Sequence, residues 1–161
     1  MKTAIIISAF AFFIICSSCN ENKPSEIKII GKWWKYDIPE KEYNEFDIDE
    51  KSIGIFSHGM GNIGMTEYNI DGDTLYFREG KFNIKFISDN QFIMSINGHT
   101  DTLNRLSDSI TTFNVIDHHN DSVFDIFYDR FQNRAYETWI KYGYVTREEL
   151  ENSFIEYEEN D

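Results

Sequence analysis

The sequence predicts a mainly β protein, a small eight-stranded antiparallel up-and-down barrel followed by a C-terminal amphipathic helix and a shorter helix. From Ile27 onward, β-branched and aromatic residues alternate with polar ones at period two, as in half-buried strands. Turn-forming pairs such as Asn97-Gly98 separate these runs. After Ile116 the apolar period lengthens to three or four residues, which indicates helix. Loops this short join neighbouring strands, and closing an eight-stranded meander leaves no exposed edge.

The first 18 residues have the parts of a secretory signal. A basic residue, Lys2, precedes an apolar run from Ala4 to Ile15, and small residues precede Cys19. The run is shorter than the ~20 residues of a transmembrane helix, which disfavours a permanent span. Ser17, Ser18 and Cys19 resemble a lipobox, the processing site of bacterial lipoproteins. The resemblance implies cleavage after Ser18 and lipid on Cys19, and an ordinary cleaved signal peptide is the alternative.

This reading implies a mature protein that a lipid on Cys19 holds in the bacterial cell envelope, with the outer membrane as the expected site. Cys16 would leave with the signal, so the mature chain must be stable without a disulfide. We expect a lipidated tether over residues 19–26, the barrel over 27–116, and a helical segment packed on the barrel over 117–161.

Composition limits the partners of the chain. It has 28 acidic and 15 basic residues, a formal net charge of -13, and this charge repels nucleic acid at long range. We therefore expect no nucleic-acid partner. The adjacent His118 and His119 cannot both readily face one ion, and no EF-hand loop is present. No metal and no cofactor are expected.

The eight strands are separated by turn residues. Pairs such as Asp71-Gly72 supply the positive φ of tight hairpins. Gly54, Gly61 and Gly64 indicate either a bulge or bend, or a barrel end open to a ligand. The expected strands are Ile29–Asp37, Tyr43–Asp49, Ser52–His58, Asn62–Ile70, Thr74–Arg78, Phe82–Ser88, Gln91–Ile96 and Thr100–Leu106.

One face of the fifth, sixth and seventh strands is apolar throughout. The opposite face carries polar residues such as Asn83, Lys85 and Ser95. We therefore assign the apolar face to the barrel interior. The candidate cavity-lining residues are Leu75, Phe77, Phe82, Ile84, Phe86, Phe92, Met94 and Ile96.

Two short motifs resemble the lipocalin family. Gly31-Lys32-Trp33 opens the first strand and looks like the Gly-x-Trp signature, and Arg105 in the last strand looks like the arginine that packs across this tryptophan. Such a contact gains on the order of 1 kcal/mol. In lipocalins these residues are structural. The resemblance implies a cavity for a small apolar or amphipathic ligand, and the alternative is a barrel filled by Phe and Met.

The C-terminal third is predicted to be helical. Ser107–Ile116 forms either a short strand or an irregular connection, and Asp121 or Ser122 begins a helix that Gly143 ends. Thr146-x-x-Glu149 begins a shorter helix. The long helix has an aromatic face that either packs on Trp34 and Tyr36 of the barrel or docks a partner or a membrane. This face contains Phe124, Phe127, Phe131, Ala135, Trp139 and Tyr142.

No catalytic motif is present, and we expect a non-catalytic protein. The leading hypothesis is a membrane-anchored, lipocalin-like lipoprotein that binds a small apolar or amphipathic ligand. The alternative is an envelope protein with a filled barrel that binds another protein, as an inhibitor or immunity protein does. A hydrolase or isomerase would need facing ionisable groups inside the barrel. Lys35 with Asp37, and His58 with His99 and Asp101, are the groups to inspect.

Overall fold

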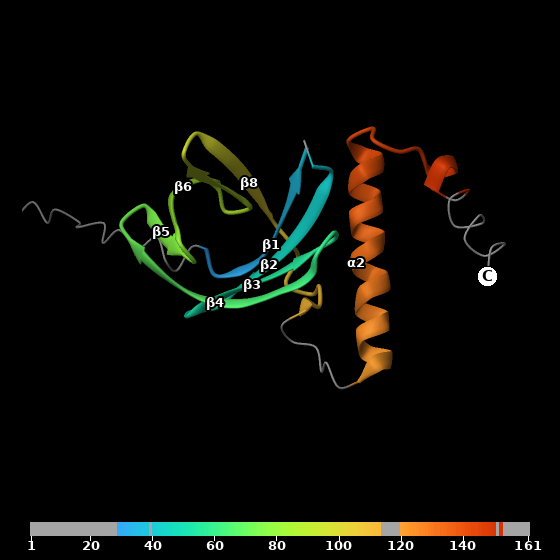
Figure 1. The fold of residues 1–161 in the computed structure, drawn as a ribbon, viewed down its shortest axis with the longest axis horizontal. Helices are drawn as coiled ribbons and strands as arrows, with labels where there is room; N and C mark the ends of the chain where they lie inside the picture. Colours follow the sequence, from blue (N-terminus) through green and yellow to red (C-terminus); the bar gives the residue numbers. More distant parts are fainter. Residues whose placement is uncertain (1–28, 39, 114–119, 151, 153–161) are drawn as a thin grey trace, which may run out of the picture.

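The structure is a computed structural model that describes residues 29–38, 40–113, 120–150 and 152. The predicted signal segment, Ser18, Cys19 and the tether lie outside the described residues, as do residues 114–119 and the last part of the second helix. The described chain forms eight strands and one long helix (Figure 1). They are β1 (Gly31–Asp37), β2 (Glu42–Ile48), β3 (Ser52–Ser57), β4 (Gly61–Asp71), β5 (Thr74–Phe77), β6 (Gly80–Ser88), β7 (Gln91–Ile96), β8 (His99–Arg105) and α2 (Asp121–Lys141).

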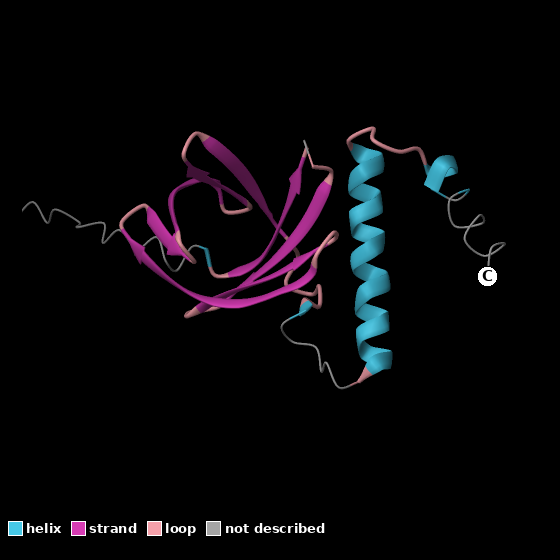
Figure 2. Cartoon of the chain, viewed as in Figure 1, coloured by secondary structure: helices cyan, strands magenta, loops and turns pink. Residues whose placement is uncertain are grey.

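The strands form a closed barrel in sequence order, from β1 to β8, and every neighbouring pair is antiparallel (Figure 2). The predicted up-and-down barrel is therefore confirmed. Closure brings β1 beside β8, through the pairs Trp33↔Arg105 and Trp34↔Asn104. These two pairs lie at one end of the barrel, and the strands run on beyond them toward the other end.

The turns follow the sequence prediction. Asn97 and Gly98 both have positive φ, +50° and +82°, as a tight two-residue hairpin requires. In β4, Asn62 pairs with Phe56 and Gly64 pairs with Ile55, so that an extra residue bulges out between them. Gly64 has a φ of +89°. The glycines of this strand therefore mark a β-bulge, which gives the barrel wall the curvature that closure needs.

Strand alternation places a continuous apolar cluster inside the barrel. Trp33, Phe92 and Leu103 have no exposed surface, so this part of the interior is a packed core. Apolar burial of this kind is the main source of stability in a fold that has no disulfide in the described residues. The buried members are Ile29, Trp33, Phe46, Ile48, Ile53, Leu75, Phe77, Ile84, Phe92, Met94 and Leu103.

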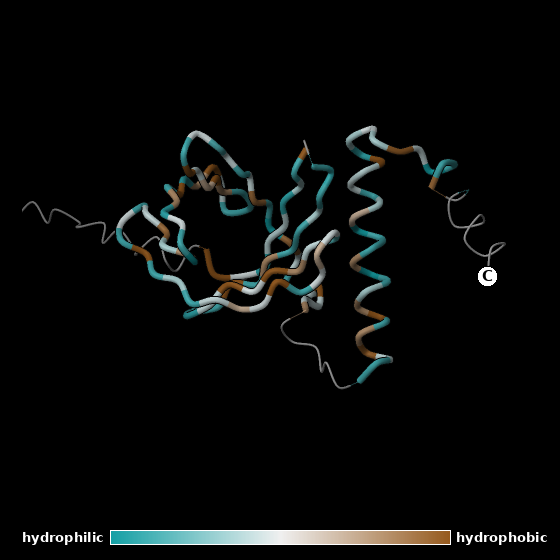
Figure 3. Tube along the Cα trace, viewed as in Figure 1, coloured by the Kyte–Doolittle hydropathy of each residue, from teal (hydrophilic) through white to brown (hydrophobic). Residues whose placement is uncertain are grey.

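The helix α2 stands against the outside of β1, β2 and β3 (Figures 1 and 2). Apolar and polar turns alternate along it (Figure 3), and its apolar side faces the barrel. Phe131 contacts both Tyr43 and Phe56, with ring centroids 5.4 and 4.8 Å apart. The packing interpretation of the aromatic face is therefore confirmed. The buried residues of this interface are Tyr43, Phe56, Phe113, Phe127, Phe131 and Ala135, with Trp34, Tyr36 and Phe124 at its margin.

The helix ends differ slightly from the prediction. The N-cap is Asn120, whose side chain accepts a hydrogen bond from the Val123 backbone N–H, and not Asp121 or Ser122. Gly143 ends the helix with a φ of +74°. Thr146 and Glu149 form the predicted capping box before the short helix, with hydrogen bonds of 2.8 to 3.1 Å.

The connection between β8 and the helix is irregular over its described part, residues 106–113, and contains no strand. For this part of the segment, the predicted irregular connection is therefore confirmed and the alternative of a short strand is wrong. In the described chain, no helix combines the length and the apolar character that crossing a bilayer requires.

Candidate functional site at the barrel mouth

The end of the barrel where β1 and β8 pair is sealed. The Arg105 guanidinium lies 4.1 Å from the centroid of the Trp33 ring, and Trp33 and Phe92 pack nearly perpendicular to each other with ring centroids 4.6 Å apart. The indole N–H of Trp33 donates to the Ile29 carbonyl at 2.7 Å. Gly31 has a φ of +131°, which favours glycine, and a Cβ there would lie 2.5 Å from an Arg105 nitrogen and displace this guanidinium. The three residues that resemble the lipocalin signature therefore form one structural unit.

The other end of the barrel, which we call the mouth, is hollow and is bordered by residues such as Lys35, Glu42 and Asp101. A cavity of about 310 Å³ opens there between the strands. Of the eight candidate lining residues, Phe77, Phe82 and Met94 border this cavity. Phe46 and Ile55, from β2 and β3, also contribute to its apolar wall, as do Met60 and Ile63. The cavity therefore has an apolar floor above the packed core.

The other five candidate residues lie elsewhere on the inner face. Leu75, Ile84 and Phe92 belong to the buried core toward the sealed end. Phe86 packs against that core and is only partly buried, and Ile96 is half-buried at the end of β7. The barrel therefore combines the two alternatives drawn from its sequence, because its interior is filled at one end and open at the other.

Polar side chains form the rim of the cavity. The Lys35 ammonium lies 3.0 Å from a carboxylate oxygen of Asp101, and their side chains are 18% and 17% exposed. Ser57 donates a hydrogen bond to Glu42, and Asn44 is buried beside them. The registers Lys35↔Asn44 and Asn44↔Ser57 carry these side chains onto one inner face. The partner of Lys35 is thus Asp101, and not Asp37.

The sequence interpretation missed several of these polar residues. Glu42, Asn44 and Ser57 occupy inner-face positions that read as polar, and Arg78 borders the same cavity. The available signal was the alternation of β2 and β3, in which polar residues replace apolar ones toward the mouth. Polar residues at inward positions of a barrel indicate a wet, accessible region.

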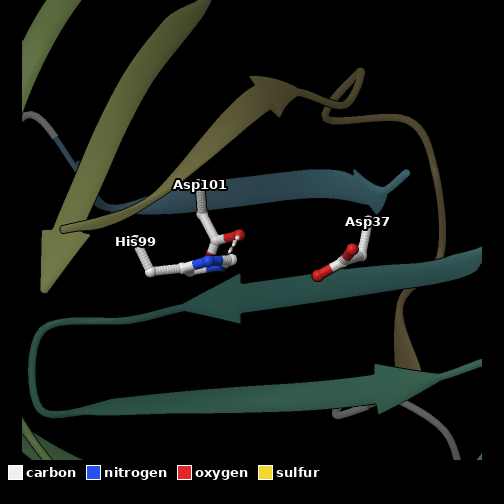
Figure 4. A group of neighbouring side chains, drawn as sticks. All are labelled: Asp37, His99 and Asp101. Carbon is white, nitrogen blue, oxygen red and sulfur yellow. Dashed lines mark hydrogen bonds and ion pairs between the residues drawn. The ribbon is translucent and has the colours of Figure 1, made fainter. Parts of the chain in front are cut away.

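A second group of side chains lies where β1 and β8 separate. Asp37, His99 and Asp101 each offer a donor atom within 4.8 Å of the others (Figure 4). They border a further cavity of about 450 Å³, together with Trp34 and Thr102. His58 does not join them: its ring packs against Trp139 of α2, with centroids 4.7 Å apart.

Another charged cluster joins α2 to the outside of the barrel. Arg134 donates two hydrogen bonds to the Glu45 carboxylate, at 2.6 and 3.0 Å, and the Tyr43 hydroxyl donates a third at 2.8 Å. Burial and the neighbouring Glu45 raise the pKa of Tyr43 far above its usual range. Burial alone would lower the pKa of Arg134, but Glu45 raises it. These three hydrogen bonds to one buried carboxylate fix α2 to the outside of the barrel.

The lining of the mouth combines an apolar wall with polar side chains. Its apolar wall can hold a hydrocarbon group, and Lys35, Asn44 and Asp101 can donate or accept hydrogen bonds at the rim. An amphipathic molecule would match this distribution of polar and apolar groups.

Comparison with known proteins assigns no family to the chain. No family model, no curated protein and no solved structure matches it. The geometry of the barrel mouth is therefore the evidence that bears on function.

Proposed function

We propose that this protein is a membrane-anchored barrel that binds a small amphipathic molecule at its mouth. The cavity of about 310 Å³, with an apolar floor and a polar rim, carries the proposal. Its volume lies near the lower end of the roughly 300–1,000 Å³ of ligand pockets. The molecule would therefore be small, with a short hydrocarbon part.

The arrangement of the cavity defines how such a molecule would lie. Its apolar part would contact Phe77, Phe82 and Met94, where each buried methylene contributes about 0.8 kcal/mol. Its polar head would meet Lys35 and Asp101 at the rim. These two side chains are partly exposed, so they can exchange hydrogen bonds with a ligand without the cost of opening a dry ion pair.

Lipid on Cys19 would hold the barrel near a membrane, which is a source of amphipathic molecules. The test is fractionation of cells that express the chain with Cys19→Ser, and Cys16→Ser is the matched control. We expect the Cys19 variant to leave the membrane fraction while the Cys16 variant stays there. Equal behaviour of the two variants would contradict lipidation at Cys19.

The binding proposal is tested by native mass spectrometry of the full chain, purified in detergent from its own envelope. We expect a reproducible extra mass in the range of small amphiphiles. Phe82→Glu should remove it, because this change puts a charge in the cavity wall. Ile87→Glu is the control, because Ile87 is on the same strand and is 51% exposed.

Circular dichroism of both variants would verify that they fold. An apo mass for the folded wild-type chain would contradict the proposal, and so would an extra mass that survives Phe82→Glu.

A second candidate function is the binding of an envelope protein. The exposed Val123 and Ile126 border a groove of about 330 Å³ between α2 and the chain that follows β8. Apolar residues in such a groove fit a partner that presents apolar side chains. Cross-linking in the envelope would test this function: Ile126→Glu should remove a cross-linked partner, and Asn133→Glu, elsewhere on the exposed surface of the helix, should keep it.

A further inference from the structure

We propose that Asp37, His99 and Asp101 bind a divalent transition metal ion that joins β1 to β8 at the barrel mouth. The three side chains point toward one another from two strands that are far apart in sequence (Figure 4). The inference does not rest on the proposed ligand, although Asp101 borders both the gap between these strands and the apolar cavity.

Strand geometry supplies the first argument. The backbone pairs between β1 and β8 are Trp33↔Arg105 and Trp34↔Asn104. Continuing the same register along both strands would put Asp37 opposite Asp101. Like charges directly opposite each other destabilise a sheet. A cation between the two carboxylates would turn this repulsion into attraction, at the place where the strands lack ladder pairs.

The donor atoms supply the second argument. His99 and Asp101 are two residues apart on β8, so their side chains lie on the same side of the strand. One imidazole nitrogen and two carboxylate oxygens form a ligand set that suits zinc and neighbouring first-row metals. The donor atoms lie within 4.8 Å of one another, and a tetrahedral zinc site holds them roughly 3.4 Å apart. Small rotations, chiefly of the exposed His99 side chain, would close this difference.

Lys35 is the group that competes with the metal. Its ammonium lies 3.0 Å from Asp101 Oδ2, while Asp101 Oδ1 faces the His99 Nε2 at 3.3 Å. In the metal-free protein, Lys35 therefore neutralises one of the two carboxylates. Replacing Lys35 by methionine should strengthen metal binding, because it removes a like charge next to the ion. A role of Asp101 restricted to pairing with Lys35 would give no such gain.

The proposed site leaves an exchangeable coordination position. Three protein ligands do not complete a zinc shell, and the fourth position would face the cavity of about 450 Å³ that these residues border. Water or an anionic group of a small molecule can occupy such a position. The ion would therefore act as a clamp on the barrel seam that can also bind an external ligand.

The test is calorimetric titration of Zn²⁺ into the full chain, without an affinity tag and in detergent, after treatment with a chelator. We expect one ion per chain. His99→Ala and Asp37→Asn should each weaken binding by at least tenfold, and Lys35→Met should strengthen it. The control is a double variant, His118→Ala with His119→Ala, which should bind zinc like the wild type.

A thermal melt gives a second readout that does not depend on the calorimeter. Zinc should raise the unfolding midpoint of the wild type and of the double-histidine control, but not that of His99→Ala. Midpoints measured without zinc would verify that the variants fold. Unchanged zinc binding in His99→Ala and Asp37→Asn would overturn the proposal, and so would loss of binding in the double-histidine control. Tighter binding of Ca²⁺ than of Zn²⁺ would overturn the assignment to a transition metal.

Discussion

Two ion pairs lie on opposite faces of the same barrel wall and differ in burial and in the number of hydrogen bonds that hold them. Glu45 and Arg134 form a pair on the outer face, where the Glu45 side chain is 2% exposed and accepts three hydrogen bonds. Lys35 and Asp101 form a single contact on the inner face, at the rim of a cavity. Glu45 and the inward-facing Asn44 are adjacent in β2, so strand alternation alone separates the two environments.

Their different burial and hydrogen bonding indicate that the two ion pairs have different roles. A buried pair held by several hydrogen bonds fixes the position of α2, and breaking it costs about 3–5 kcal/mol. A partly exposed pair with one contact contributes little stability and can change partners. We infer that the outer pair holds the helix and that the inner pair is available to bind. Mutations at the outer pair should therefore mainly lower the unfolding free energy, and mutations at the inner pair should mainly weaken binding.

The largest expected effect is on the outer pair. Arg134→Ala leaves the Glu45 carboxylate buried without its cation, which should cost about 3–5 kcal/mol of unfolding free energy. Urea denaturation measures this loss. Arg147→Ala is the control, because its pair with Glu137 is more than 60% exposed and should contribute at most ~0.5 kcal/mol. Similar losses in the two variants would contradict the structural role of the outer pair.

An intermediate effect is expected at alkaline pH. The pKa of Tyr43 in the folded protein is raised by burial and by Glu45, so the folded state keeps a proton that the unfolded state releases above pH ~10. Its contribution is complete below that pH and is lost as the pH rises further. Stability should fall by up to ~1.4 kcal/mol per pH unit above pH ~10.

This pH dependence can be assigned to Tyr43 by substitution. Tyr43→Phe should make the alkaline slope shallower than in the wild type, as measured by urea denaturation at several pH values. An unchanged slope in this variant would mean that other groups cause the loss.

The smallest effect on stability is expected at the inner pair. Lys35→Met should change the unfolding free energy by about 1 kcal/mol or less, because the pair is partly exposed. The same change should reduce occupancy of the cavity by the bound molecule, as measured by native mass spectrometry. Lys85→Met, an exposed residue of β6, should alter neither quantity. A large loss of stability in Lys35→Met would mean that the inner pair has a structural role, as the Glu45–Arg134 pair does.

The sequence predicted the strands well because period two and hairpin turns are local signals. The turn at Asn97-Gly98 and the inward Phe77, Phe82 and Met94 follow from neighbouring residues alone. The predicted N-cap was wrong by one or two residues, because Asn, Asp and Ser cap helices about equally well and Asn120, Asp121 and Ser122 are consecutive.

The polar sites could not be predicted in the same way. Arg134 and Glu45 are 89 residues apart, and Asp37 meets Asp101 only because the barrel closes. Alternation gives the face on which each residue lies, but not which residue faces it across the barrel. The register of all eight strands determines which side chains meet across the barrel, and this register cannot be read from any local sequence pattern.

Methionine methyl NMR would show directly whether a small molecule occupies the mouth of the barrel. Met94 and Met60 border the cavity, whereas Met65 is 54% exposed in β4 and does not. Spectra of the full chain would be compared before and after its bound molecule is removed by chromatography. We expect the signals of Met94 and Met60 to move and the signal of Met65 to stay in place. Identical spectra, or an equal shift of all three signals, would contradict binding at the mouth.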